Sequence, residues 1–87
     1  MEQIKRNDKI ASRIIDDEML LLNYVTGDNW IFRGVAIDIW NMLDKPCFIN
    51  NIINELMMIY DSQEETLNTD IMEFISKCVK LDICELI

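Results

Sequence analysis

The chain has no histidine and only two glycines among its 87 residues. The absence of histidine removes the commonest general base and the commonest metal ligand of proteins. Gly27 and Gly34 stand apart from each other, so the chain has no glycine-rich loop that could cradle a phosphate. The carboxylates that cluster at Asp16-Asp17-Glu18 are typical of a solvated turn rather than of an acid–base pair. We therefore expect no catalytic residue, no metal site and no cofactor.

Cysteine is also scarce, and its arrangement excludes two classes of small protein. Cys47, Cys78 and Cys84 are odd in number and have no Cys-x-x-Cys spacing, unlike a secreted disulfide scaffold or a zinc site. The N-terminus lacks the apolar region of a signal peptide. No apolar run approaches the roughly 18 residues that a membrane span requires. The sequence therefore predicts a soluble cytoplasmic protein with reduced thiols.

Basic residues are outnumbered, since 8 Lys and Arg face 16 Asp and Glu, giving a formal net charge of −8. This excess of negative charge repels polyanions, so we expect neither nucleic acid nor a membrane surface as a partner. Hydrophobic residues make up 51% of the chain, which is enough to build a compact core. The length predicts a single domain over residues 1–87.

Two hydrophobic periodicities follow one another along the chain. Alternation of apolar and polar residues predicts strands over residues 9–15, 19–25 and 30–33. The second of these is apolar on both faces at residues 19–22, which favours a central position in a small sheet. Three antiparallel strands in chain order would leave the third at an edge. Residues 1–8 are polar, and we expect them to be disordered.

Beyond Gly34 the period becomes helical. The pattern predicts helices over about residues 35–43, 49–60 and 70–81. Pro46 ends the first, and Asp70 with Glu73 has capping-box-like spacing at the start of the third. The predicted fold class is therefore α+β: a three-stranded antiparallel sheet followed by three helices, similar to a winged helix-turn-helix.

The third predicted helix has two apolar stripes. The stripe that we assign to the core consists of Ile71, Phe74, Cys78 and Leu81. The second stripe consists of Met72, Ile75 and Val79. A helix buried on two sides would explain both stripes, and so would a groove in which the second stripe contacts an apolar peptide.

Short motifs follow the predicted strands in a fixed order. They are Ile39-Trp40, Pro46, Ile52-x-x-x-Leu56-x-x-x-Tyr60-Asp61 and Asp70-Ile71-x-x-Phe74-Ile75. Their order and spacing resemble the PqqD family. Members of this family are small peptide-recognition domains of pathways that make ribosomally synthesised, post-translationally modified peptides (RiPPs). The resemblance covers nearly all of the chain from about Lys9 onward.

The sequence departs from the family pattern at three places. Phe32-Arg33 replaces the Leu-Asn that often precedes the first helix, and Phe48 replaces a Thr that often opens the second. Asp82 replaces the Gly that commonly follows the third helix. The first two changes remove side-chain caps, which stabilise a helix by about 1 kcal/mol each.

The resemblance implies a non-enzymatic RiPP recognition element, or peptide chaperone, that binds the leader of a precursor peptide. It also implies presentation of that leader to a modifying enzyme, such as a radical SAM enzyme, a leader protease or a cyclase. In the family the leader adds as a strand to the third strand and lies against the third helix. Carried over by position, the peptide-binding residues are Asn29, Trp30, Ile31, Phe32, Arg33, Met72, Ile75, Ser76 and Val79. Independently, an edge strand offers unpaired backbone groups to an extended peptide.

Other interpretations stay open. In a winged-helix DNA-binding regulator the third helix would need basic residues, and Lys77 and Lys80 are offset by three nearby acidic residues. A protein–protein adaptor that does not contact the precursor is a further alternative. Trp30 and Phe32 are also consistent with core packing, and Arg33 with a solvated edge charge or with contact to an acidic leader residue.

Overall fold

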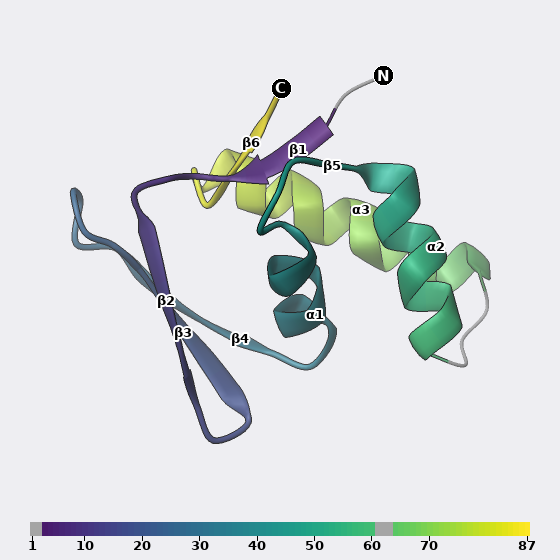
Figure 1. The fold of residues 1–87 in the computed structure, drawn as a ribbon, viewed down its shortest axis with the longest axis horizontal. Coiled ribbons are helices and arrows are strands. Elements are labelled where there is room, and N and C mark those ends of the chain that lie inside the picture. Colours follow the sequence, from purple (N-terminus) through teal and green to yellow (C-terminus); the bar gives the residue numbers. More distant parts are fainter. Residues whose placement is uncertain (1–2, 61–63) are drawn as a thin grey trace.

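The computed structural model describes residues 3–60 and 64–87 (Figure 1). In chain order its elements are β1 (Gln3–Arg6), β2 (Ile10–Ile15), β3 (Glu18–Asn23), β4 (Asn29–Arg33), α1 (Val35–Met42), β5 (Cys47–Phe48), α2 (Ile49–Ile59), α3 (Glu64–Lys80) and β6 (Cys84–Leu86). Within the described residues, no helix combines the length and the apolar character needed to cross a membrane. The mixed α+β architecture, with a three-stranded antiparallel sheet ahead of three helices, confirms the predicted fold class.

The predicted sheet consists of β2, β3 and β4, with β3 in the centre and both neighbours antiparallel to it. Met19 and Leu21 of β3 are buried, whereas Leu20 and Leu22 are exposed on the opposite face. At the end of β3 the side chain of Asn23 accepts hydrogen bonds from the backbone N–H groups of Val25 and Thr26, at 3.0 and 3.1 Å. This Asx turn leads the chain back into β4.

A second sheet, not predicted from the sequence, has the order β5-β1-β6 with antiparallel pairing throughout. Figure 1 shows β1 beside β6, so that the two ends of the chain meet there. The expectation of disorder over residues 1–8 is therefore wrong where β1 forms. Ile4, the single apolar residue of β1, is completely buried. Pairing with segments remote in sequence, rather than local periodicity, creates this strand.

The core centres on Trp40 of α1, which three neighbouring elements hold in place. Its indole N–H donates to the Ser12 hydroxyl at 3.1 Å, and its ring lies edge-to-face with Phe32 at 6.3 Å between centroids. The Arg6 guanidinium lies 4.5 Å from the centre of the Trp40 ring and donates to the Trp40 carbonyl. Burial of Arg6 lowers the pKa of its guanidinium. These contacts join β1, β2 and β4 to α1.

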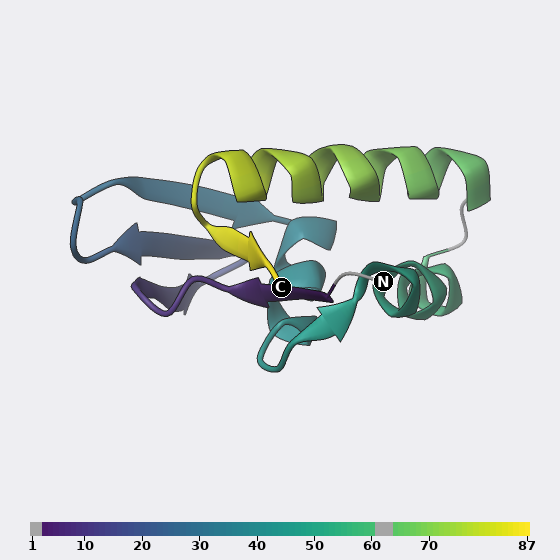
Figure 2. The same ribbon diagram turned by 90° about the horizontal axis from the view of Figure 1, so that it is seen from above.

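α3 lies along one side of the molecule, above the strands and the other two helices in Figure 2. It begins at Glu64, so the predicted start near Asp70 is wrong and the Asp70–Glu73 spacing caps no helix. Leu67 explains the longer helix, because it is buried one turn before the buried Ile71. Residues 61–63 of the predicted polar loop lie outside the described residues.

The end of α3 is a Schellman motif. The Ile83 N–H donates to the Cys78 carbonyl at 2.9 Å, and the Asp82 N–H donates to the Val79 carbonyl at 3.2 Å. Asp82 has φ 60°, a left-handed conformation that favours glycine. The N-cap positions of α1 and α2, Gly34 and Phe48, make no side-chain capping hydrogen bond, as the departures in sequence predict.

Candidate functional site

β4 is an edge strand, since its only ladder among the described residues joins it to β3. The Asn23 N–H donates to the Asp28 carbonyl at 2.8 Å, in register with this ladder. Hydrogen-bonded pairs alternate in an antiparallel ladder, so Leu21–Trp30 and Met19–Phe32 are the next such pairs. The Tyr24 N–H to Lys9 carbonyl bond on the other side of β3, at 3.1 Å, agrees with this alternation.

This alternation decides which backbone groups of β4 face outward. Trp30 and Phe32 direct their N–H and C=O groups toward β3. Asn29, Ile31 and Arg33 therefore direct theirs away from the sheet, toward the open edge. Three alternate residues thus offer donors and acceptors to an added strand.

A groove of about 280 Å³ runs beside this edge, between β4 and the C-terminal half of α3. Its lining residues are Trp30, Ile31, Phe32, Arg33, Ala36, Phe74, Lys77, Cys78, Leu81 and Ile83. The Phe32 and Phe74 rings meet edge-to-face, with centroids 5.2 Å apart, and so connect the strand to the helix. An apolar floor next to unpaired backbone groups is suited to an extended peptide with apolar side chains.

The residues predicted on the strand lie at this groove, with one exception. Trp30, Ile31, Phe32 and Arg33 line it, whereas Asn29 belongs to β4 without lining it. Phe32 is 8% exposed and contributes both to the core and to the groove floor. Trp30 is half-buried. The two interpretations of these aromatic residues, core or groove, therefore apply together.

The residues predicted on the helix do not line the groove. Ile75 is 4% exposed and belongs to the core. Met72 and Ser76 line a neighbouring hollow on α3, which shares only Lys77 with the groove, and Val79 is half-buried against the core. The groove wall instead consists of residues spaced i, i+3, i+4 and i+7: Phe74, Lys77, Cys78 and Leu81.

Three residues of the stripe that the sequence assigned to the core thus line the groove: Phe74, Cys78 and Leu81. Periodicity showed that α3 is apolar over a wide arc, but it gave no information on which part of this arc is buried and which part faces β4. The signal that was missed is Leu67, which with Ile71 and Ile75 defines the truly buried direction of the helix. Leu81, 41% exposed, is an apolar residue left open at the groove.

The charges at the groove differ in sign from those of the whole chain. Its ten lining residues include Arg33 and Lys77 but no Asp or Glu, although the chain has net charge −8. Arg33 forms an ion pair with Glu18 of the neighbouring strand β3. Lys77 is exposed and forms no ion pair within the described part of the chain.

Cys78 is the one thiol in the groove wall. Hydrogen bonding to Cys84 and burial raise the pKa of the Cys78 thiol well above its usual range. The thiol therefore stays protonated at neutral pH and is a poor nucleophile. Cys78 contributes apolar surface to the groove rather than reactivity.

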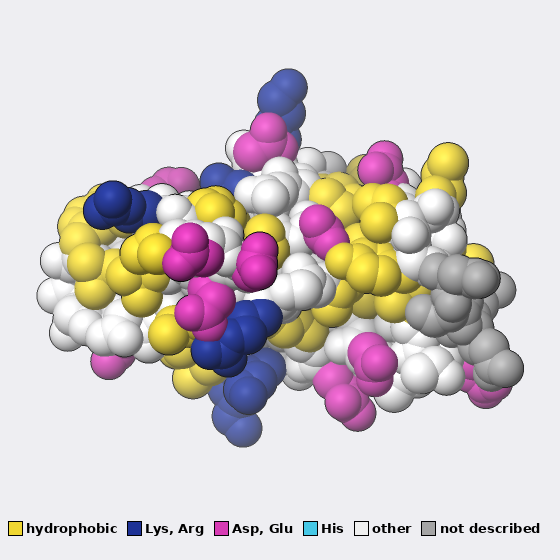
Figure 3. Space-filling model, turned by 90° about the horizontal axis from the view of Figure 1, so that it is seen from below, with side chains coloured by type: hydrophobic (Ala, Val, Ile, Leu, Met, Phe, Trp, Pro, Cys, Tyr) yellow, Lys and Arg dark blue, Asp and Glu magenta, His cyan; other side chains and the backbone are white. Residues whose placement is uncertain are grey.

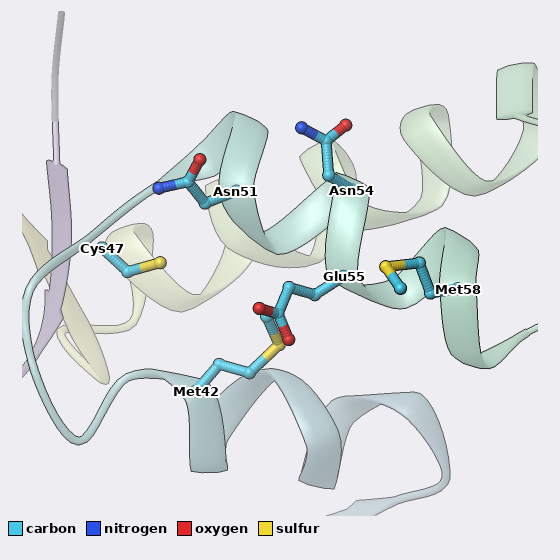
Figure 4. A pocket seen from close by; sticks show the side chains of 6 residues that line it. All are labelled: Met42, Cys47, Asn51, Asn54, Glu55 and Met58. Atoms are coloured by element: carbon cyan, nitrogen blue, oxygen red, sulfur yellow. The ribbon is translucent and has the colours of Figure 1, made fainter.

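A larger hollow, of about 470 Å³, lies on α1 and α2 (Figure 4) and shares no lining residue with the groove. Met42 and Glu55 extend toward each other across it, and Met58 lines it one turn further along α2. Burial and the charge of Glu55 raise the pKa of Cys47, which also lines this hollow. Figure 3 shows that the face of the molecule seen from below carries hydrophobic side chains in more than one patch. Cys47 belongs to the edge strand β5, but this strand is only two residues long, compared with five for β4 at the groove.

The fold and this site together define a winged-helix-like α+β protein with an open strand edge beside its last helix. The model of one protein family, described as Coenzyme PQQ synthesis protein D (PqqD), matches residues 18–83. The chain belongs to the PqqD family, which confirms the resemblance seen in the sequence. The matched range includes both walls of the groove, β4 and α3.

A solved structure described as TbiB1 in complex with the TbiA(beta) leader peptide is similar to this chain. The two chains are 26% identical, and their structures align with a TM-score of 0.85. The alignment covers 93% of this chain and 94% of TbiB1. No curated protein matches the sequence.

Proposed function

We propose that this protein is a RiPP recognition element that binds the leader segment of a precursor peptide by strand addition to β4. The observation that carries the proposal is an open strand edge directly beside an apolar groove. Family membership and the similarity to TbiB1, which is described in complex with a leader peptide, support it.

In the proposed complex the leader extends the sheet β2-β3-β4 by a fourth strand. The outward N–H and C=O groups of Asn29, Ile31 and Arg33 form main-chain hydrogen bonds, which tolerate many peptide sequences. Side chains of the leader on the inner face enter the groove and contact Phe74 and Leu81, which supplies selectivity. We expect micromolar or better affinity for the cognate leader.

We further propose that the protein is not an enzyme but presents the bound leader to one, such as a radical SAM enzyme, a leader protease or a cyclase. Presentation requires a second contact surface away from the groove. The end of α2 supports this role, because Met58 is 88% exposed and Met57 and Ile59 beside it are also exposed. Flexible methionine side chains are common at surfaces that bind other proteins.

The direct experiment is selection of peptides from a displayed random library, roughly 15 residues long so that each extends beyond β4 at both ends. Selected peptides are then titrated by calorimetry and by amide NMR. We expect chemical-shift changes along residues 29–33 and at Phe74, Lys77 and Leu81. Failure to select any peptide that perturbs these residues would contradict the proposed function.

Met72 of α3 and Leu81, the residue that follows α3, are a matched pair of positions for this experiment. Leu81 and Met72 are similarly exposed, at 41% and 46%, but only Leu81 lines the groove. Leu81→Ala is expected to weaken peptide binding about tenfold through lost apolar contact, and Met72→Ala is expected to leave it unchanged. Equal effects of the two substitutions would place the peptide elsewhere on the helix.

The alternative of a DNA-binding regulator makes a different prediction. With a net charge of −8, the protein should not be retained by DNA in a gel shift at low salt. Retention there would favour the regulator. Association with a partner enzyme that persists after the leader is deleted, with no peptide binding at β4, would favour the adaptor.

A further inference from the structure

Lys77 occupies a distinctive position at the groove. It lines the groove together with Phe32, Phe74 and Cys78, on the wall that α3 supplies. The other cation at the groove, Arg33, already has Glu18 as a partner. Lys77 is thus the available positive charge on an apolar wall that contributes no carboxylate.

The register of the sheet decides which peptide side chains can reach Lys77. Residues directly opposite each other in a ladder share a face, and side chains alternate between faces along a strand. The inner face of β4 displays Trp30 and Phe32, which pair with the buried Leu21 and Met19. The outer face displays Ile31 and Arg33, and Arg33 is held there by Glu18. A peptide strand on β4 therefore points every second side chain into the groove.

We propose that the peptide bound at β4 carries a carboxylate two residues from the apolar side chain that fills the groove, and that Lys77 selects for it. This inference rests on the proposed function and specifies the class of peptide: an apolar residue, any residue, then Asp or Glu, in either direction. A carboxylate adjacent to the apolar residue would lie on the outer face, away from Lys77. The spacing, rather than acidity alone, is the distinguishing feature.

A structural role for Lys77 makes a different prediction. Lys77 and Lys80 both lie in the last turn of α3, where positive charge stabilises a helix through its dipole. Lys77 lies between the groove and a neighbouring hollow on α3 and lines both, whereas Lys80 lines only the hollow and is absent from the groove. Lys80→Met is therefore the matched control for Lys77→Met, since both remove one charge from the same helix end.

The test uses the selected library peptides and their variants in which the carboxylate is replaced by Asn or Gln. Enrichment of Asp or Glu two residues from an apolar residue is expected. Lys77→Met should weaken binding of the acidic peptides about fivefold and should hardly affect the amide variants, and Lys80→Met should affect neither. The difference between acidic and amide peptides should also shrink as salt is raised.

The outcomes separate this inference from the proposed function. Peptides that bind along residues 29–33 without a preference for a carboxylate, or with the carboxylate at an odd spacing, overturn the inference and leave leader binding intact. Equal losses in Lys77→Met and Lys80→Met also overturn it, since they indicate a general helix or charge effect. A library that yields no peptide bound at β4 contradicts the proposed function itself.

Discussion

The two three-stranded sheets have the same antiparallel form but different edges. In the sheet β5-β1-β6 the central strand comes from the N-terminus, and its neighbours are only two and three residues long. In the sheet β2-β3-β4 the edge strand β4 has five residues and faces a groove. Short edge strands protect a protein against unwanted pairing, whereas a longer open edge invites it. The first sheet fixes the chain ends, and the second has the geometry of a peptide-binding edge.

The largest expected effect is a difference in the free energy of unfolding between substitutions in the two sheets. Ile4→Ala in β1 removes a completely buried side chain and should lower the free energy of unfolding by about 3 kcal/mol. Ile14→Ala in β2 is the matched control, because Ile14 is 53% exposed, and it should cost less than about 1 kcal/mol. Urea unfolding measures both. Similar costs would show that β1 contributes no more to the fold than the exposed strand does.

The next effect concerns binding rather than stability. Ile31→Pro removes the central outward N–H of β4 without removing a hydrogen bond to β3, so peptide affinity should fall more than about tenfold in a folded protein. Ile14→Pro removes an outward N–H at the opposite edge of the same sheet and should leave affinity unchanged. Calorimetry with a selected peptide measures the affinities. If only Ile14→Pro weakened binding, the peptide would pair with β2 instead.

The smallest effect tests how the end of α3 connects to β6 in the sheet β5-β1-β6. Asp82 is in the left-handed conformation at the end of α3, where the family commonly has glycine. Asp82→Gly should raise the free energy of unfolding by about 0.5–1 kcal/mol, because glycine adopts this conformation without strain. The Asn7 side chain donates to the backbone carbonyl of Asp82 at 2.7 Å, which the substitution leaves in place. A thermal melt checks this, and a loss of stability would mean that the Asp82 side chain contributes to the turn.

Local patterns in the sequence predicted the sheet β2-β3-β4 and missed the sheet β5-β1-β6. Alternation around Trp30 and Phe32 identified β4 as a strand, and the order of the strands placed it at an edge. The helical spacing after Gly34 identified α1. β1 has no such pattern, because Ile4 is its only apolar residue and its pairing partners are remote in sequence. Strands of this kind are determined by tertiary contacts, which a single sequence does not display.

At the candidate site, too, the sequence did not display the contacts between remote segments. Four of the five residues expected on the strand, Trp30 to Arg33, line the groove, because the position of β4 at an edge follows from strand order. The helix wall was displaced by two positions, because Phe74, Lys77, Cys78 and Leu81 line the groove where Met72, Ile75, Ser76 and Val79 were expected. Two apolar stripes about 100° apart on one helix are equally compatible with either orientation. Only the contact between Phe74 and Phe32 decides which stripe faces the groove.

Hydrogen exchange of the β4 amides tests the central claim most directly. Without peptide, the amides of Trp30 and Phe32 should exchange slowly because they bond to β3, and those of Asn29, Ile31 and Arg33 should exchange fast. Adding a selected peptide should slow the outward-facing amides of β4 while leaving the other two as they were. An unchanged fast exchange at Ile31 in the saturated complex would contradict strand addition at this edge.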